Sequence, residues 1–149
     1  MDKIIMYCDG ACKGNGTTQN AVGGWGVYLV YKDNTKRLYG GSPSTTNNIM
    51  ELTACIEGLK ALKRKDIPII LYTDSNYVVK GMTEWIEGWK AKGWTRGKNK
   101  PLLNVELWKT LDALCQTYQV QFVWVKGHAD NLGNLEADRL ANLGAQQYL

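Results

Sequence analysis

The run Ile69-Ile70-Leu71-Tyr72-Thr73, which carries no charge and ends at Asp74, constrains the fold of this chain more than any other feature. A continuous apolar run of this length is typical of a strand that is buried on both faces, between helices. A second apolar run, Ile4 to Cys8, ends in the same way at Asp9. Two such strands favour an α/β domain with part of its sheet parallel.

Changes in hydrophobic period indicate the remaining elements. Residues 25–31 and 36–41 are predicted as strands, so the first forty residues form an antiparallel meander. Apolar residues spaced by three and four predict an amphipathic helix over residues 48–63. Further helices are expected at 77–82, 84–92, 105–118 and 135–147, with a basic loop at 93–101 and a last strand at 120–126. This order predicts a single α/β domain over residues 1–149, with a mixed sheet flanked by helices.

The composition excludes several classes of protein. Hydrophobic residues make up 44% and charged residues 21% of the 149 residues, which fits neither a disordered nor a fibrous chain. No apolar run approaches the ~18 residues that span a bilayer. The first residues contain no cleavage site of a signal peptide, so a cytoplasmic location is expected. Four cysteines, without a CxxC pair, are then predicted to be reduced, core-filling thiols: Cys8, Cys12, Cys55 and Cys115.

The basic charge is concentrated in one segment. Residues 80–100 contain six basic and two acidic residues, which accounts for the net charge of +4 of the whole chain. Trp85, Trp89 and Trp94 alternate with these charges, a pattern that favours a nucleic-acid surface. The alternative is a helix whose tryptophans belong to the core and whose lysines are only solvated.

Four acidic residues are candidates for one site. If the two apolar strands are parallel neighbours, Asp9 and Asp74 lie at the carboxyl end of the sheet, where open α/β sheets bind ligands. Glu51 is expected in the first turn of the helix that starts near Asn48, and Asp138 lies on the terminal helix. Four such groups could not all stay ionised together without a cation. Their oxygens favour Mg²⁺ or Mn²⁺, and two ions ~4 Å apart recur in phosphodiester hydrolysis.

Each acid also has a structural alternative. Asn48 and Glu51 have the spacing of a capping box, in which Glu51 serves only the start of the helix. Asp74 could cap the helix that follows it. Asp138 could be one exposed charge of an amphipathic helix, and His128, the only histidine, could be a surface residue.

Six motifs, in order, resemble those of the type 1 ribonuclease H family, and the resemblance covers nearly the whole chain. They are Tyr7-Cys8-Asp9-Gly10-Ala11-Cys12, Gly23-Gly24-Trp25-Gly26, Thr45-Thr46-Asn47-Asn48-Ile49-Met50-Glu51-Leu52, Tyr72-Thr73-Asp74-Ser75-Asn76-Tyr77-Val78, Trp124-Val125-Lys126-Gly127-His128-Ala129 and residues 134–141.

The resemblance implies a ribonuclease H-like fold, with a five-stranded mixed sheet whose second strand is antiparallel to its neighbours. It implies an endonuclease that hydrolyses the RNA strand of RNA–DNA hybrids and leaves 5′-phosphate and 3′-hydroxyl ends. Asp9, Glu51, Asp74 and Asp138 would hold two divalent ions, Mg²⁺ with Mn²⁺ as a substitute. His128 would assist proton transfer or product departure, and its ordinary pKa near neutrality suits that role.

The resemblance also implies contacts with both strands of the hybrid. Asn15, Asn47 and Asn76 would test the 2′-hydroxyls of the RNA strand. Thr46 and Asn104 would lie near a phosphate of the DNA strand, with Trp85 on a deoxyribose. The basic protrusion at about residues 80–100 would bind phosphates through its lysines. These are Lys90, Lys92 and Lys98.

The sequence departs from the family in two places. The loop at residues 15–22 is longer than in many relatives, and Leu135, beside Glu136, replaces a glutamate of some relatives. No separate hybrid-binding module is expected, and the chain is predicted to act as a monomer without an obligate protein partner. Two other functions stay open: a DNA-acting nuclease of the same fold, like resolvases and integrases, and a hybrid-binding module without catalysis.

Overall fold

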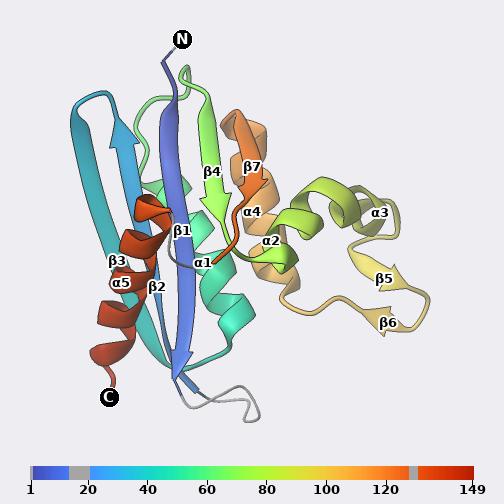
Figure 1. The fold of residues 1–149 in the computed structure, drawn as a ribbon. Helices are drawn as coiled ribbons and strands as arrows, with labels where there is room; N and C mark the ends of the chain where they lie inside the picture. The colour runs from blue at the N-terminus through green and yellow to red at the C-terminus, as the bar shows by residue number, and fades with distance from the viewer. Residues whose placement is uncertain (1, 14–20, 128–130) are drawn as a thin grey trace.

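The computed structural model describes residues 2–13, 21–127 and 131–149, and its centre is a five-stranded sheet (Figure 1). The strand order is β3-β2-β1-β4-β7. The second strand, β2, is antiparallel to β1 and β3, whereas β4 is parallel to β1 and β7. This confirms the predicted mixed sheet and its opening meander. The strands are β1 (Ile4–Lys13), β2 (Ala21–Tyr31), β3 (Asn34–Thr45), β4 (Ile69–Thr73) and β7 (Val120–Trp124).

Helices cover both faces of this sheet (Figure 1). Helices α1 (Asn47–Lys60) and α4 (Val105–Thr117) pack on one face, over a core that includes Leu52, Leu71 and Trp108. Helix α5 (Leu132–Gln146) lies on the other face, against β1, β2 and β3. Its backbone lies directly on β2, because a Cβ at Gly26 would come within 2.3 Å of the Ala137 carbonyl oxygen.

The segment between β4 and α4 extends away from the sheet (Figure 1). It contains α2 (Asn76–Lys80), the π-helical segment η1 (Gly81–Trp85), α3 (Ile86–Ala91) and a hairpin of β5 (Thr95–Gly97) and β6 (Lys100–Pro101). The helices predicted at 77–82 and 84–92 correspond to α2 and α3, but η1 joins them, so the helical backbone continues without a break from Asn76 to Ala91. A π-helical turn shifts the hydrophobic pattern, so one helical stretch looks like two in the sequence. The basic loop predicted at 93–101 contains the hairpin.

Strand β1 is longer than its apolar run, so Asp9 lies within a strand and not at its end. The parallel pairing of β1 with β4 stops at Tyr7 and Tyr72, whereas the pairing with β2 continues to Lys13. Strand β3 likewise extends beyond the predicted residues 36–41, because backbone pairing with β2 continues through exposed polar residues. Polar residues on a solvated edge strand conceal it from pattern analysis.

The helix starts exclude two of the structural alternatives. Thr46 caps α1, because its hydroxyl accepts a hydrogen bond from the Ile49 backbone N–H at 3.2 Å. The alternative of a capping box formed by Asn48 and Glu51 is therefore excluded, and Glu51 lies just past the first turn of the helix. The Ser75 hydroxyl caps α2 by accepting from the Val78 N–H at 3.1 Å, so Asp74 does not have this role.

Helix α5 begins three residues earlier than predicted. Its N-cap is Asn131, whose side-chain oxygen accepts a hydrogen bond from the Asn134 N–H at 2.9 Å. The cap places Gly133 and Asn134, both buried, inside the helix. An asparagine cap ahead of a glycine gives a weak hydrophobic signal, which explains why the sequence pattern alone misplaces this start.

All four cysteines are free thiols, and Cys8 and Cys55 are buried within the core. Within the described residues, no helix is both long enough and apolar enough to span a bilayer.

Candidate active site

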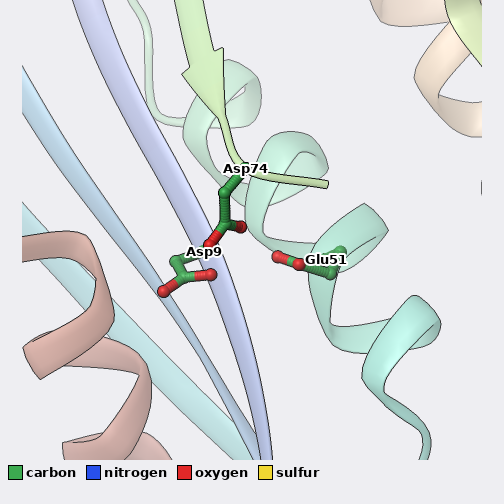
Figure 2. Close-up of side chains that lie close together, drawn as sticks. All are labelled: Asp9, Glu51 and Asp74. Carbon is green, nitrogen blue, oxygen red and sulfur yellow. The ribbon is translucent and has the colours of Figure 1, made fainter. Parts of the chain in front are cut away.

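Three acidic side chains converge beside the centre of the sheet (Figure 2). Asp9 comes from β1, Glu51 from α1 and Asp74 from the residue after β4. One carboxylate oxygen of each lies within 4.8 Å of the others. The side chains of Asp9 and Glu51 are almost inaccessible, with only 4% and 6% of each residue exposed. Three acids from three distant segments of the chain therefore share one buried site.

Strand register and one glycine produce this convergence. Tyr7 pairs with Tyr72 in the parallel ladder, and the same register continued by two residues sets Asp9 opposite Asp74. Helix α1 approaches the strand closely at Gly10, where a Cβ would lie 2.6 Å from the Glu51 backbone nitrogen. Gly10 therefore admits the helix backbone and, with it, the third carboxylate.

The electrostatics of the three acids are unfavourable without a cation. Burial raises the pKa of Asp9 to about 10, and the charges of Glu51, Asp74 and Asp138 add to the effect. Burial, followed by the Asp74 charge, also raises the pKa of Glu51 well above its usual range. Within the described part of the chain, the buried Glu51 Oε1 has no hydrogen-bond partner. An orphaned carboxylate oxygen among other carboxylates fits a hard divalent cation.

Asp138 joins this site from the opposite face of the sheet. It lies on α5, is exposed, and does not belong to the group of three acids within 4.8 Å. Its side chain nevertheless contacts Asp9, since both a hydrogen bond and the charge of Asp138 contribute to the raised pKa of Asp9. The predicted set of four acids is therefore a close group of three with a fourth at its edge.

A pocket of about 490 Å³ lies between the start of α1 and the segment after β4. Two predicted substrate residues, Trp85 and Asn104, line it, and 40% of Trp85 is exposed. Tryptophan rings connect this pocket to the core. The Trp85 and Trp89 ring centroids are 5.9 Å apart, and those of Trp89 and the buried Trp108 are 5.1 Å apart.

Comparison with known proteins identifies the family. The ribonuclease H family matches residues 1–146. Ribonuclease H of Methylobacillus flagellatus is 54% identical over 98% of this chain and 93% of its own length. Ribonuclease HI of Neisseria meningitidis serogroup B is 52% identical over 97% of each chain. This chain belongs to the ribonuclease H family.

Solved structures of ribonucleases H share the fold. LC9-RNase H1, described as a type 1 RNase H with the type 2 active-site motif, is 31% identical to this chain. It superposes with a TM-score of 0.89 and covers 99% of this chain and 74% of that chain. LC11-RNase H1, solved in complex with an RNA/DNA hybrid, is 23% identical with a TM-score of 0.72, which shows the shared fold alone.

The predicted substrate residues of this ribonuclease H family member differ in their surroundings. Thr46 is the N-cap of α1, while Asn47 and Asn76 are exposed first residues of α1 and α2. Asn104, just before α4, donates a hydrogen bond from Nδ2 to the Tyr77 hydroxyl oxygen at 3.1 Å. Asn15 and His128 lie outside the described residues.

The three predicted lysines are not equivalent. Lys90 Nζ lies 3.3 Å from an Asp112 carboxylate oxygen on α4 and 3.6 Å from one of Glu87. Hydrogen bonding and charge from Asp112 raise the pKa of Lys90. Lys92 and Lys98 are exposed and form no ion pair with any described residue. Lys90 therefore holds α3 against α4, whereas the other two remain available to an anionic partner.

Sequence reasoning missed several residues of the pocket. Tyr77 connects the pocket to the core, because its hydroxyl accepts hydrogen bonds from both Asn104 Nδ2 and, at 3.2 Å, Trp108 Nε1. Asn48, Arg96, Leu102 and Leu103 complete the lining. Arg96 belongs to the basic segment that the sequence indicated, whereas the other three gave no signal of their own, since it is the tertiary fold that brings α1 and the hairpin to one pocket.

Proposed function

We propose that this chain is an endoribonuclease that hydrolyses the RNA strand of RNA–DNA hybrids and leaves 5′-phosphate and 3′-hydroxyl ends. Membership of the ribonuclease H family supports this activity. The observation that carries the proposal is the group of the buried Asp9 and Glu51 with the half-buried Asp74, in which one carboxylate oxygen of each lies within 4.8 Å of the others. Such a group is suited to divalent cations and is costly to the fold without them.

Asp9, Glu51, Asp74 and Asp138 would hold the cations, which we propose to be two Mg²⁺ ions, with Mn²⁺ as a substitute. When bound, the ions would supply Lewis-acid stabilisation of both the attacking and the leaving oxygen. The carboxylates fix where the scissile phosphate binds, and the buried position of Asp9 and Glu51 excludes water from their other sides. We assign proton transfer or product departure to His128, which follows β7 in the sequence.

Recognition of a hybrid requires contacts with two different strands. Asn47 and Asn76 are exposed beside the acids at the starts of two helices, where amide groups can hydrogen-bond to 2′-hydroxyls, and Asn15 is proposed to join them. The pocket lined by Trp85 and Asn104 lies farther along the surface and suits the DNA strand, with Thr46 near a phosphate. A ring packed on a deoxyribose disfavours the additional hydroxyl of RNA.

A parallel digest tests this proposal. Hybrid, duplex DNA and duplex RNA of one sequence are incubated with the protein, in a titration of Mg²⁺ and in excess chelator. We expect cleavage of the hybrid alone, only with metal, and only in the RNA strand, with 5′-phosphate ends. The Asp74→Asn variant serves as the control and should be inactive. Cleavage of duplex DNA would favour the DNA-acting alternative, and full activity in chelator would refute the metal assignment.

A further inference from the structure

Helix α5 carries Asp138 to the metal site, and it packs on the sheet partly through direct contact of backbone with backbone. A Cβ at Gly24 would lie 2.0 Å from the Ala141 carbonyl oxygen, and one at Gly26 would lie 2.3 Å from that of Ala137. At these two positions the helix rests on bare backbone. Apolar burial is non-directional, whereas hydrogen bonds and ion pairs can determine how α5 is turned relative to the sheet.

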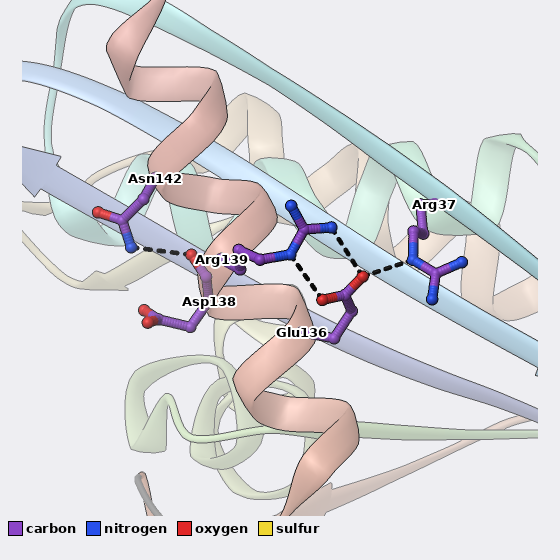
Figure 3. Close-up of polar contacts among 5 residues, drawn as sticks. All are labelled: Arg37, Glu136, Asp138, Arg139 and Asn142. Atoms are coloured by element: carbon purple, nitrogen blue, oxygen red, sulfur yellow. Dashed lines mark hydrogen bonds and ion pairs between the residues drawn. The ribbon is translucent and has the colours of Figure 1, made fainter.

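Glu136 provides a directional contact between α5 and β3 (Figure 3). Its carboxylate accepts a hydrogen bond from Arg37 Nε, on β3, and two from Arg139, on α5 itself, at 2.8 and 2.9 Å. Only 19% of the Glu136 side chain is exposed. The Arg37 guanidinium also lies 4.8 Å from the centre of the Tyr28 ring, on β2. The ion pair thus connects the helix to β3, and the contact of Arg37 with Tyr28 extends the connection to β2.

Glu136 and Asp138 have separate roles, although only one residue lies between them. In Figure 3 the Glu136 side chain points to Arg37 and Arg139, whereas the Asp138 carboxylate points to the other side of the helix. Glu136 is therefore not a substitute for the acid that Leu135 replaces.

A second contact lies on the far side of Asp138. Asn142 Nδ2 donates a hydrogen bond to the Asp138 backbone oxygen at 2.9 Å, and its own Oδ1 accepts one from Lys13 Nζ at the end of β1. Strand β1 also carries Asp9. The two contacts flank Asp138 along the helix and connect it to the sheet on both sides.

We propose that Arg37 and Glu136 are positioning residues for the metal site: their ion pair fixes the orientation of α5 and so holds Asp138 beside Asp9. This inference rests on the proposed function, because it assigns Asp138 to the cations. Directional, charge-assisted hydrogen bonds of an arginine fork are suited to this role. Residues that orient metal ligands typically change metal affinity about 10- to 100-fold when they are removed.

A purely electrostatic effect predicts the opposite sign. Arg37→Ala removes a positive charge from the neighbourhood of an acidic site, which by charge alone would strengthen cation binding. Loss of positioning would weaken it. Arg139→Ala is the matched control, because Arg139 also bonds to Glu136 and carries the same charge but connects α5 only to itself.

The experiment measures Mn²⁺ binding to the metal-free protein by electron paramagnetic resonance, without substrate. Parent, Arg37→Ala, Glu136→Gln, Arg37→Lys and Arg139→Ala are compared at a temperature where thermal unfolding shows each to be folded. We expect Mn²⁺ affinity to fall about 10-fold in Arg37→Ala and Glu136→Gln, and less than about 2-fold in Arg139→Ala. Arg37→Lys should recover part of the loss. The Mg²⁺ concentration for half-maximal cleavage should rise in parallel, with near-parental kcat at saturating Mg²⁺.

Equal or tighter Mn²⁺ binding by Arg37→Ala would overturn the positioning role, as would equal losses in Arg37→Ala and Arg139→Ala. Failure of the parent protein to bind Mn²⁺ would instead refute the proposed function. Asp138→Asn separates the two cases: if it weakens binding while Arg37→Ala does not, the metal assignment stands and only the positioning role is lost.

Discussion

The acid cluster and the tryptophan pocket are built in contrasting ways. Asp9, Glu51 and Asp74 are brought together from β1, α1 and the end of β4, and two of them are buried. Most of the pocket comes from one continuous segment, from Tyr77 to Asn104, and its key ring, Trp85, is exposed. The first region is assembled from three distant segments, and the second mainly from one segment to which α1 adds Asn48. Changes in the two regions should therefore affect different quantities, turnover in the cluster and affinity in the pocket.

The largest expected effect is the loss of turnover in Asp9→Asn. The substitution removes a charge that the cations require and barely alters the shape of the side chain. We expect cleavage of the hybrid to fall by about 1000-fold, or ~4 kcal/mol, while hybrid affinity stays within about threefold of the parent. Single-turnover kinetics and a binding titration measure the two quantities. A parallel loss of hybrid affinity would contradict the assignment of turnover to the acid cluster and of affinity to the pocket.

The second effect is on stability and depends on pH. The folded metal-free protein keeps a proton on Asp9 up to a pKa of about 10, whereas the unfolded chain releases it near the usual value of 3.8. Stability from this group is therefore fully present below pH 4 and is lost as the pH rises toward 10, by about 1.4 kcal/mol per pH unit. Denaturant unfolding at pH 5 and pH 8 measures it. Asp9→Asn and added Mg²⁺ should each flatten the slope.

An unchanged slope in Asp9→Asn would show that Asp9 does not hold this proton. Lys92→Ala offers the comparison from the other region, since it lies outside the acid cluster and should leave the pH dependence of stability as it is in the parent.

The third effect belongs to the basic protrusion. Replacing Lys92 and Lys98 together by alanine should weaken hybrid binding about 10-fold and flatten its salt dependence by roughly one log–log unit per lost phosphate contact. Lys65→Ala, at the other end of the sheet, is the control. Lys90→Ala should lower the free energy of unfolding and leave hybrid affinity almost unchanged, because Lys90 is paired with Asp112. A salt dependence equal to that of the parent would show that these lysines do not contact the substrate.

The smallest effect concerns Thr46, which caps the helix that carries Glu51. Thr46→Ala removes the bond to the Ile49 N–H and should lower the free energy of unfolding by ~1 kcal/mol, whereas Thr46→Ser should keep the cap. Urea unfolding of the two variants measures this. If both lost the same stability, the methyl group and not the hydroxyl would be the important part.

The sequence predicted the fold, and the convergence of Asp9, Glu51 and Asp74, where the signal was local and strong. The apolar runs before Asp9 and Asp74 specified the central strands, and six ordered motifs specified the family. The sequence was less informative where strand pairing, or the phase of a helix, depends on the tertiary structure. Strand β1 continues past Asp9 because β2 is its neighbour, and the π-helical segment η1 divides one helical stretch into two apparent ones.

Site details failed for a related reason. Thr46 is the cap of α1 because the helix starts one residue earlier than the apolar stripe suggests. The pairing of Lys90 with Asp112 depends on α3 lying against α4, which no pattern within either helix reveals. The charge composition located the protrusion. It could not distinguish a lysine that forms an ion pair between two helices, such as Lys90, from an exposed lysine that is free to bind a phosphate.

The two innermost thiols have a practical consequence. Cys8 directly precedes Asp9, and Cys55 lies one helical turn beyond Glu51, with at most 1% of either residue exposed. An alkylating reagent can reach them only when the strand and helix that carry these acids separate. Their rate of modification therefore reports how often the acid cluster opens, and a slower rate in the presence of divalent ions would show how strongly the ions hold it closed.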